Sequence, residues 1–396
     1  MLNIIWLSWI NPFRRYADGG SEDIRRRLMV ASSAFKHIDF FAIDYRSQAT
    51  TPISLPNSIS LHLYQRYMDH RPLRWLQPLP SIRRYNNQMI SDANKILTTC
   101  HGSASPIVIL EGLQLANHWL DIRRHIGSRA ITFIRMHNLE SDYHKSIAAE
   151  SGFLRNIGHR LTARQYERAE TDLLREFDFI YTVSQSETSV IENRYPDLST
   201  RLRWVPPIAK GEKLPRAELH DKTTFIMSYF GDLTLPNNFG GLQWFCFYIL
   251  PLLDKDRYRL HIAGKGSDDF NRFANVRTFG YVDSIDDFLA QSHLIVAPIL
   301  SGGGVKIKVL DAMVTGKPVL TTSKGSEGLP LDVIEKMSIA SSAEEWCAKI
   351  RHIATRYSQA CDDAAELRRV AANVFSEGRF LNQLLVDIGI KNASSD

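Results

Sequence analysis

Short apolar runs with β propensity alternate with helical stretches along most of the sequence, and this alternation restricts the folds open to the chain. The strands predicted for the first half are residues 3–9, 38–43, 59–64, 106–110, 130–135 and 179–183. Helices are predicted between some of them, at residues 22–33, 82–97 and 162–176. Strands that alternate with helices form parallel sheets covered on both faces. The first half therefore predicts a doubly wound α/β domain.

A second series of the same kind follows a break in the pattern at residues 204–216, where Pro206-Pro207 and Lys210-Gly211 favour turns. Its predicted strands are residues 224–230, 259–263, 276–281, 294–298 and 318–322, and its predicted helices are 238–250, 285–291 and 305–315. Ser342 and Glu345 form a capping box before further helical sequence that runs to about residue 388. We expect two Rossmann-like domains, residues 1–205 and 221–375, with a linker at 206–220. A C-terminal helix and tail, 376–396, could pack back on the first domain.

The length and composition agree with two folded domains. A chain of 396 residues with 44% hydrophobic residues is longer than a usual single core requires. Its four cysteines are scattered, so they predict neither a metal site nor a disulfide framework and suit a reducing cytoplasm. The apolar run at residues 2–10 is too short to span a bilayer, and no other run approaches the ~20 residues needed. We expect a cytoplasmic protein, either soluble or peripheral at the inner face of the membrane.

Charge is distributed unevenly between the two halves. Residues 1–210 contain 27 Lys and Arg against 20 Asp and Glu, and the remainder contains 21 against 23. The basic clusters of the first half, which could hold it against an anionic membrane or acceptor, are Arg14-Arg15, Arg25-Arg26-Arg27, Arg83-Arg84 and Arg123-Arg124. For any single cluster, an ordinary solvated helix face is the favoured alternative. No zinc-finger or RNA-recognition signature accompanies the charge, so we expect no nucleic-acid partner.

Residues 301–329 combine a triple glycine, a predicted helix that ends at Gly316 and a following β-run. Glycines let the backbone approach a ligand closely, and the free N–H groups and dipole of a helix start favour negative charge. Lys306 and Lys308 add positive charge, so the segment predicts a diphosphate-binding loop. The alternative from the motif alone is a buried helix with a glycine-rich lead-in and two solvated lysines. Such a loop would lie at the carboxyl ends of the strands, in a cleft framed by the two halves.

Several separate segments, in their order along the chain, resemble the retaining GT-B glycosyltransferases, particularly bacterial polysaccharide and lipopolysaccharide sugar transferases. They are residues 19–22 (GGSE), 110–112 (LEG), 135–141 (RMHNLES), 183–187 (VSQSE), 230–232 (FGD), 236–237 (PN), 262–266 (IAGKG), 279–282 (FGYV) and 301–329. The resemblance covers almost the whole chain and implies the GT-B architecture, with two doubly wound Rossmann-like domains facing across a cleft. It also implies a nucleotide-diphosphate sugar as donor substrate, with no tightly bound cofactor and no metal in catalysis.

The resemblance assigns nucleotide-binding positions in the second domain. Gly264 and Lys265 would form a nucleotide-contacting turn after a strand, and Val282 would present backbone groups to the base. A simple turn is the equal alternative for Gly264. Asp269 stands where a GxGxxG sequence would have its last glycine, so a dinucleotide-binding fingerprint is not supported.

Two positions depart from the family pattern around the glycine loop. Gly303 and Asp311 stand where relatives carry glutamates, the first for the sugar hydroxyls and the second for the ribose. Asp311 keeps a carboxylate that can accept hydrogen bonds from the ribose. Sugar recognition would then depend on other residues or on the backbone N–H groups of Gly303, Gly304 and Val305.

A third departure removes two positive charges. Many relatives carry an Arg and a Lys after the first strand of the second domain, where this chain reads DLTLPNN at residues 232–238. Lys306 is the best substitute, in a catalytic role that stabilises the leaving diphosphate, and Lys308 is the second. The alternative is a solvated lysine on a helix face.

In the first domain, His137 ends a predicted strand where the family presents a histidine to the donor sugar. We predict a catalytic role in which its neutral imidazole hydrogen-bonds a sugar hydroxyl and positions the anomeric carbon. Gly20 would admit the donor phosphate or the acceptor, with a tight turn before the helix as the equal alternative. Glu111 and Glu140 are weaker candidates for acceptor contacts, because helix capping and solvated charge explain them nearly as well.

The sequence thus predicts a retaining glycosyltransferase that moves a hexosyl or related group from a nucleotide-diphosphate sugar to a glycan, lipid-linked or other hydroxyl acceptor. Bacterial surface polysaccharide or glycoconjugate synthesis is the expected setting. The donor phosphate would accept the acceptor's proton during front-face attack. Two alternatives stay open. One is a GT-B nucleotide-sugar epimerase or hydrolase, and the other is a noncatalytic GT-B binding or scaffold protein, suggested by Gly303 and the missing Arg/Lys pair.

Overall fold

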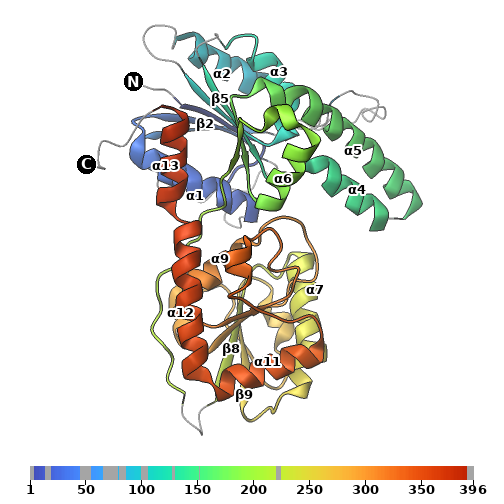
Figure 1. Cartoon of the computed structure of the whole chain (residues 1–396), viewed down its shortest axis with the longest axis vertical. Helices are drawn as coiled ribbons and strands as arrows, with labels where there is room; N and C mark the ends of the chain where they lie inside the picture. Colours follow the sequence, from blue (N-terminus) through green and yellow to red (C-terminus); the bar gives the residue numbers. More distant parts are fainter. Residues whose placement is uncertain are drawn as a thin grey trace. The chain divides into compact units, whose positions relative to one another are not determined.

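The computed structural model describes residues 4–13, 19–44, 55–65, 79, 86–99, 106–126, 130–150, 152–219 and 224–389. The chain divides into two compact units. The first contains Met1–Pro206 and the C-terminal segment Phe380–Asp396, and the second contains Pro207–Arg379. A parallel sheet forms the centre of each unit (Figure 1). Among the described residues, no helix is both long enough and apolar enough to cross a membrane.

The first unit has a sheet of seven parallel strands in the order β3-β2-β1-β4-β5-β6-β7. The strands are β1 (Ile4–Ser8), β2 (Ile38–Asp44), β3 (Ile59–Gln65), β4 (Ile107–Glu111), β5 (Ile131–Met136), β6 (Phe179–Thr182) and β7 (Leu202–Trp204). Every residue of β1, β2 and β4 is buried, as expected for parallel strands with helices on both faces. β1 and β4 are neighbours in register, with Ser8 opposite Glu111.

The helices of the first unit are α1 (Gly19–Ala34), α2 (Asn87–Thr99), α3 (Ala116–Ile122), α4 (Glu140–Glu150), α5 (Phe153–Leu173) and α6 (Gln185–Arg194). The chain returns to this unit through α13 (Glu377–Asp387), which belongs to it from Phe380 onward. Asp387 accepts hydrogen bonds from the Tyr181 hydroxyl (2.8 Å) and Arg203 Nε (3.1 Å). The last helix is therefore fixed to β6 and β7 by side chains.

The second unit has a six-stranded parallel sheet in the order β10-β9-β8-β11-β12-β13. Its strands are β8 (Phe225–Phe230), β9 (Tyr258–Ala263), β10 (Val276–Thr278), β11 (Leu294–Ala297), β12 (Val319–Thr321) and β13 (Ser338–Ile339). Its helices are α7 (Pro236–Trp244), α8 (Ile285–Ala290), α9 (Ile307–Val314), α10 (Leu331–Ile334), α11 (Ala343–Thr355) and α12 (Tyr357–Val374). Trp346 on α11 is fully buried and packs edge-on against Phe245, which anchors this helix to the core.

The eleven strands predicted from the sequence are all present, but short or capped elements were missed. β7 and β13 have three and two residues, too few for a periodic signal. The predicted helix 162–176 is wrong at its start, because α5 begins at Phe153. α6 follows a capping box in which Ser184 Oγ accepts from Glu187 N at 3.2 Å. The capping box at Ser342 is confirmed, since its hydroxyl accepts from Glu345 N at 3.2 Å.

Candidate functional site

The second unit has its topological switch point between the neighbouring strands β8 and β11. From β8 the chain builds the sheet outward through β9 and β10 on one side, and from β11 it builds the sheet outward through β12 and β13 on the other. Ligands of open parallel sheets bind at the carboxyl ends of such strands. Here β8 ends at Phe230 and is followed by Gly231, and β11 leads through residues 298–306 into α9. Both segments therefore lie where the fold places a ligand.

Gly264 brings the end of β9 against the end of β8. Its φ is 133°, and a Cβ atom at this position would lie 1.9 Å from the carbonyl oxygen of Gly231. Its N–H donates to the Gly280 carbonyl at 2.6 Å. No other residue type fits this contact without moving backbone, so Gly264 has a structural requirement whether or not it touches a nucleotide.

Two of the three glycines in the loop have a left-handed backbone. Gly302 and Gly304 have φ values of 100° and 67°. Ser301 Oγ donates to Asn237 Oδ1 at 3.0 Å, so the loop lies against the first turn of α7. Gly303 is exposed, and Val305 is half-buried. The helix predicted at 305–315 is wrong at its first residues, because α9 begins at Ile307 with Lys306 as its N-cap.

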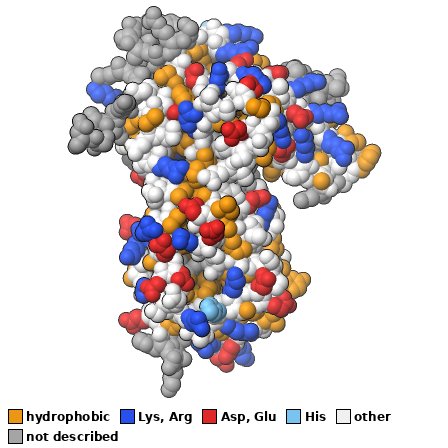
Figure 2. All heavy atoms as spheres, viewed as in Figure 1, with side chains coloured by type: hydrophobic (Ala, Val, Ile, Leu, Met, Phe, Trp, Pro, Cys, Tyr) orange, Lys and Arg blue, Asp and Glu red, His pale blue; other side chains and the backbone are white. Residues whose placement is uncertain are grey.

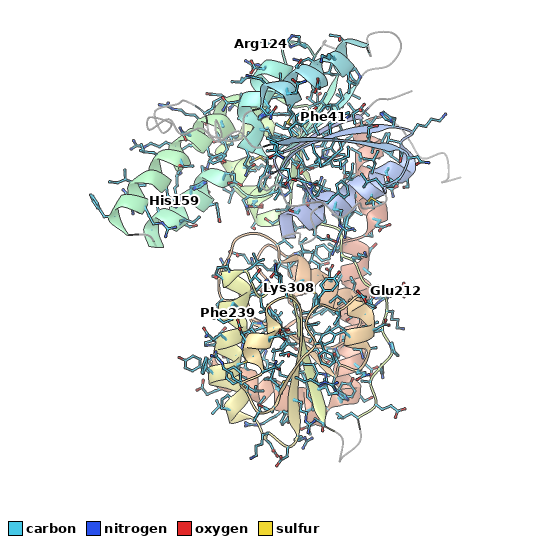
Figure 3. All side chains as sticks on the ribbon, turned by 180° about the vertical axis from the view of Figure 1, so that it is seen from behind. Phe41, Arg124, His159, Glu212, Phe239 and Lys308 are labelled. Atoms are coloured by element: carbon cyan, nitrogen blue, oxygen red, sulfur yellow. The ribbon has the colours of Figure 1, made fainter. Side chains whose placement is uncertain are left out.

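Lys308 reaches from α9 to the end of β8 (Figure 3). Its Nζ donates to the Tyr229 hydroxyl at 3.0 Å and to Asn238 Oδ1 at 2.5 Å. It would lie 3.4 Å from a Cβ atom on Gly231. Desolvation of the enclosed ammonium lowers the pKa of Lys308 to about 7. An amine with this pKa gains a proton readily when an anion binds beside it.

Lys306 lies at the N-cap of α9 and folds back over the loop. Its Nζ donates to the carbonyl oxygens of Gly303, at 3.2 Å, and of Gly304. It also forms an ion pair with Glu327 at 3.5 Å, and its side chain is 11% exposed. Lys306 therefore fixes the loop, and its positive charge is partly neutralised by a carboxylate. Among the described residues, the hydrogen-bond partners of Lys308 are instead neutral groups.

Asp311 lies one turn after Lys308 on α9 and binds the segment that precedes β8. Its Oδ1 accepts a hydrogen bond from the backbone N–H of Lys210 at 2.8 Å. A Cβ atom on Gly211 would lie 3.4 Å from the Asp311 carbonyl oxygen. The carboxylate thus has a structural partner in the segment that precedes β8, and its ribose contact stays a prediction.

The other predicted nucleotide contacts are surface positions near strand ends. Lys265 is exposed, and its carbonyl oxygen accepts from Leu233 N at 2.9 Å. Val282 is half-buried and follows Gly280, whose N–H donates to Ser267 Oγ at 3.2 Å. Lys265 follows the carboxyl end of β9, and Val282 follows the carboxyl end of β10. These two strands lie next to β8 in the sheet, on the side away from β11.

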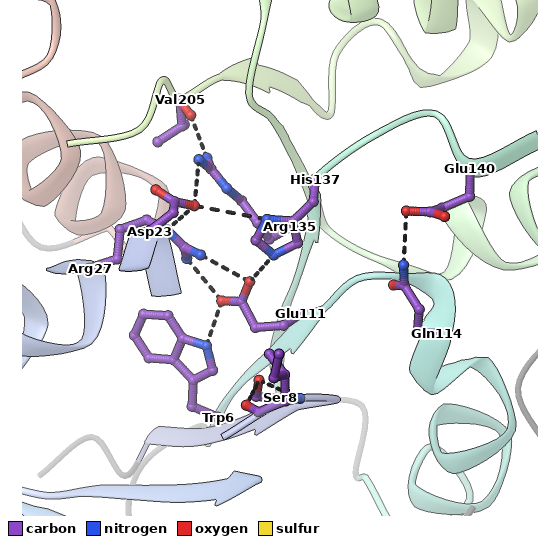
Figure 4. A network of polar contacts seen from close by, with 11 residues as sticks. Trp6, Ser8, Asp23, Arg27, Glu111, Gln114, Arg135, His137, Glu140 and Val205 are labelled. Atoms are coloured by element: carbon purple, nitrogen blue, oxygen red, sulfur yellow. Dashed lines mark hydrogen bonds and ion pairs between the residues drawn. The ribbon is translucent and has the colours of Figure 1, made fainter. Parts of the chain in front are cut away.

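The first unit has the same switch point between β1 and β4, and a network of buried charges lies there (Figure 4). Glu111, the last residue of β4, is fully buried. Its Oε1 accepts from Trp6 Nε1 at 2.7 Å and from Arg27 Nη1 at 2.9 Å. Its Oε2 pairs with Arg27 Nη2 at 2.9 Å and with His137 Nε2 at 2.7 Å. Glu111 is therefore neither a cap nor a solvated charge, and its oxygens are occupied by protein donors.

A second carboxylate completes the network. Asp23 Oδ2 accepts from Arg27 Nε at 3.1 Å and from Arg135 Nη2 at 3.2 Å. Burial, the largest influence, raises the pKa of Glu111, but Arg27 and His137 outweigh it and hold that pKa below the usual range. Arg135 and Arg27 likewise lower the pKa of Asp23 against the effect of burial. Both carboxylates are therefore ionised at neutral pH.

His137 follows β5 directly and is held by these carboxylates. Its Nε2 lies 2.7 Å from Glu111 Oε2, and its Nδ1 lies 4.0 Å from Asp23 Oδ2. An ionised carboxylate only accepts hydrogen bonds, so Nε2 carries the proton. The side chain is 13% exposed, which leaves part of the ring accessible at the carboxyl end of the sheet.

Other polar residues surround the loop after His137. Glu140 is buried and accepts from Gln114 Nε2 at 2.8 Å. Glu187 accepts from Leu139 N at 3.2 Å, and burial, the largest influence, raises its pKa. These contacts hold the backbone between β5 and α4. Gly20 lies exposed in the first turn of α1, so its predicted ligand contact stays a prediction.

The prediction that the arginine clusters either face an anionic membrane or acceptor or form solvated helix faces is partly wrong. Arg27 is buried in the network and is neither solvated nor available to a membrane. Arg25 and Arg26 both pair with Glu22, at 2.6 Å and 2.8 Å. In the cluster at residues 123–124, Arg123 pairs with Glu176 and Arg124 pairs with Asp121. The clusters at residues 14–15 and 83–84 lie outside the described residues.

Two Rossmann-like units, each with a topological switch point between two neighbouring strands, are characteristic of the GT-B fold. Three solved structures have the same architecture over nearly their whole length. A sucrose-phosphate synthase from Thermosynechococcus elongatus is 16% identical, with 98% of this chain and 99% of that chain covered at a TM-score of 0.68. WaaG, a glycosyltransferase involved in lipopolysaccharide biosynthesis, is 15% identical, with 98% and 100% covered at 0.64. HepE from Anabaena, solved with UDP and glucose, is 12% identical, with 98% and 100% covered at 0.63.

The second unit also matches a family at the level of sequence. Residues 224–356 match the family described as group 1 glycosyl transferases. A protein of Klebsiella pneumoniae, described as an uncharacterized 44.6 kDa protein in the cps region, is 27% identical over 261 residues. This match covers 61% of the chain and 63% of the length of that relative. The fold and the family match together support a glycosyltransferase.

Proposed function

We propose that the protein is a retaining glycosyltransferase that uses a nucleotide-diphosphate sugar and transfers the sugar to a hydroxyl of a glycan or lipid-linked acceptor. The observation that carries the proposal is the position of Lys308 at the switch point of a domain that matches group 1 glycosyl transferases. Synthesis of a bacterial surface polysaccharide or glycoconjugate is the proposed setting. The relative in a cps region and the fold neighbour in lipopolysaccharide biosynthesis support it.

In the proposed donor site, the diphosphate binds between the end of β8 and the start of α9. The N–H groups at the start of α9 and the glycine loop would face it, since the helix dipole favours an anion there. Lys308 supplies the nearest ammonium, in the place of the Arg/Lys pair that residues 232–238 lack. HepE was solved with UDP-glucose, which supports a nucleotide sugar as the ligand class.

In the proposed chemistry, the bond between the anomeric carbon and the diphosphate oxygen breaks while the acceptor oxygen attacks from the same face. The acceptor's proton passes to the departing phosphate oxygen. Lys308, Lys306 and the loop N–H groups stabilise the growing negative charge of the leaving group. His137 hydrogen-bonds a sugar hydroxyl and orients the donor without forming a covalent bond.

The proposal is tested in two stages. Nucleotide sugars are first screened for thermal stabilisation of the purified protein, because a ligand that binds only the folded state raises its apparent stability. The selected α-linked donor is then turned over with candidate acceptors, and the configuration of the product is determined by NMR. Inversion at the anomeric carbon would refute the retaining mechanism. Release of a free or epimerised sugar without transfer would favour the epimerase or hydrolase, and binding without turnover would favour a scaffold.

A further inference from the structure

A pocket lies at the amino end of β12, on the edge of the second sheet opposite to the glycine loop. It is lined by Pro318, which precedes β12, and by Val319, the first residue of this strand, and its sides come from α11 and α12. Its volume is about 240 Å³. Pockets for drug-sized ligands usually have roughly 300–1,000 Å³, so this one suits a compact ligand. Because the proposed donor binds at the carboxyl ends of the strands, the donor site does not account for this pocket.

The α11 side of the pocket is cationic. Lys349 and His352 on α11 and Arg356, its C-cap residue, line the pocket, and their spacing of three and four residues places them on one face. His352 and Arg356 are exposed, and neither forms an ion pair with a residue that the structure describes. Lys349 Nζ donates to the carbonyl oxygen of Ile339 at 2.6 Å, which is a neutral partner. These side chains can therefore donate to an anion without first breaking a bond to a carboxylate.

The α12 side of the pocket carries hydrogen-bond acceptors. Gln359 and Asp363 lie one turn apart, and Gln359 Nε2 donates to Asp363 Oδ1 at 2.8 Å. A carboxylate offers about four acceptor positions, so Asp363 can also accept from a ligand. The buried side chains of Ile353 and Leu367 add apolar surface to the lining. In Figure 2, Lys and Arg side chains lie among Asp and Glu side chains over α12 and the adjoining end of α11.

We propose that this pocket binds a sugar phosphate, a phosphate monoester that carries several hydroxyl groups. The phosphate accepts from Lys349, His352 and Arg356, because hydrogen bonds between cations and phosphate oxygens are strong and directional. The hydroxyls donate to Asp363 and Gln359. This separation of donors and acceptors selects the ligand class. A bare phosphate would be repelled by the carboxylate, and an uncharged sugar would leave the cationic side without a partner.

The compact volume favours a small molecule over an acidic protein segment as the occupant. All of the lining residues belong to the second unit, so the pocket is complete within it. The proposal does not rest on the proposed transferase function, because neither the donor nor the acceptor of that reaction is needed to form the pocket.

The test is isothermal titration calorimetry of the purified full-length protein. The probes are the phosphate monoesters of glucose, mannose and fructose, with inorganic phosphate and glucose as fragments. We expect at least one hexose phosphate to bind at least ~10-fold more tightly than either fragment, since each fragment makes only one of the two sets of contacts. Added salt should weaken binding, because the cations are accessible to solvent. Absence of binding by all three hexose phosphates, or binding of inorganic phosphate with equal affinity, would overturn the proposal.

Two variants separate the cationic side from the acceptor side. The double variant His352→Gln and Arg356→Gln is expected to lower the association constant for the hexose phosphate by at least ~10-fold. Asp363→Asn should reduce the preference for the hexose phosphate over inorganic phosphate, because it removes a charge that repels phosphate and weakens the acceptor for hydroxyls. All three positions are exposed, so the fold should tolerate these changes, which melting curves without ligand check.

Arg351→Gln is the matched control. Arg351 is also exposed on α11 but lies on the opposite face, where it donates to the Leu252 carbonyl oxygen at 2.7 Å. This variant should bind the hexose phosphate like the unchanged protein. Equal affinities of the control and the double variant would overturn the proposal.

Hydrogen exchange of the unchanged protein locates the ligand without relying on any variant. The hexose phosphate is expected to protect backbone amides within residues 349–367. Protection confined to residues 229–238 and 301–311 would assign the binding to the proposed donor site and overturn the proposal. Binding of a polyglutamate peptide without binding of any hexose phosphate would assign the surface to an acidic protein partner instead. Failure of the nucleotide-sugar screen would leave these measurements unchanged, so the two failures are distinguishable.

Discussion

Glu111 and Arg27 face each other in the interior of the first unit, joined by two N–H···O bonds of 2.9 Å each. The pair links the end of β4 to the middle of α1. The side chains of Arg27 and Glu111 are 1% and 0% exposed, so water cannot replace either partner. A paired carboxylate and guanidinium in this position are best explained as the support that fixes the third member of the contact, His137.

Glu111→Gln is expected to destabilise the first unit strongly. The substitution keeps the size of the side chain but leaves Arg27 as a buried charge with only Asp23 to balance it. Breaking a buried ion pair from one side typically costs about 3–5 kcal/mol. The free energy of unfolding is measured by urea denaturation. Glu212→Gln, which removes an exposed carboxylate from the segment before β8, is expected to change it little, and similar values for both variants would contradict the prediction.

Donor affinity is expected to fall as the pH rises above about 7. The unliganded Lys308 has a pKa of about 7 because its ammonium is desolvated. A bound diphosphate would raise that pKa, so the donor binds the protonated form. Below pH 7 the amine is protonated in both states and the affinity is constant. Above it the dissociation constant should increase by roughly tenfold per pH unit until the pKa of the complex is reached.

Calorimetry with the nucleotide sugar selected by the stabilisation screen measures this dependence. Such a donor is a phosphate diester, so its own charge does not change in this pH range. Lys308→Met should bind weakly at every pH, with no dependence between pH 6 and 9. Its melting temperature should not fall, because the variant removes an amine that is costly to bury. An unchanged pH profile in this variant would remove Lys308 from the site.

Lys306 and Glu327 offer a separate test of the loop charge. Lys306→Ala should lower turnover by at least ~10-fold if this ammonium stabilises the departing diphosphate. Glu327→Gln removes the carboxylate that lies 3.5 Å from Lys306, which frees the charge for the ligand. We expect this variant to bind the donor as tightly as the unchanged protein or more tightly. Turnover that is unaffected by Lys306→Ala would limit this residue to holding the loop through Gly303 and Gly304.

Gly264→Ala is expected to weaken donor binding and to lower stability. Its Cβ would meet the Gly231 carbonyl oxygen at 1.9 Å, so the ends of β8 and β9 would have to separate. The left-handed φ of 133° adds strain for any other residue. Gly240→Ala in α7 is the control, because a Cβ there meets nothing within 4 Å. Alanine favours a helix by about 1 kcal/mol over glycine, so the control should be neutral or stabilising. Melting curves with and without donor compare the two.

The sequence predicted the strands and the position of the glycine loop because these depend on local periodicity and turn chemistry. It ranked Lys306 above Lys308 on proximity to the glycines. The structure places Lys308 nearer the end of β8, since its partners Tyr229 and Asn238 come from segments 79 and 70 residues away. The spacing of these residues along the sequence does not predict that Lys308 contacts Tyr229 and Asn238.

The buried network was missed for the same reason. Glu111 receives its hydrogen bonds from Trp6, Arg27 and His137, which lie on β1, on α1 and after β5. One local signal was present. Arg27 shares a helical face with Ile24, Leu28 and Ala31, all of which are buried, and it stands four residues after Asp23. An arginine on the apolar face of a helix, with an acidic residue at this spacing, indicates a buried pair and not a solvated cluster.

His137 and Trp6 allow the catalytic role to be distinguished from support of the network. Each donates one hydrogen bond of 2.7 Å to Glu111, but only His137 lies at the carboxyl end of the sheet with part of its ring accessible. Trp6→Phe and His137→Phe should therefore cost similar stability, about 1.5–3 kcal/mol for a hydrogen bond to a charged group. His137→Phe alone should lower kcat by at least ~10-fold, because the donor sugar loses its hydrogen bond and its orientation. Steady-state kinetics at fixed pH measures the difference. Equal losses of kcat in the two variants would mean that His137 acts only by supporting Glu111.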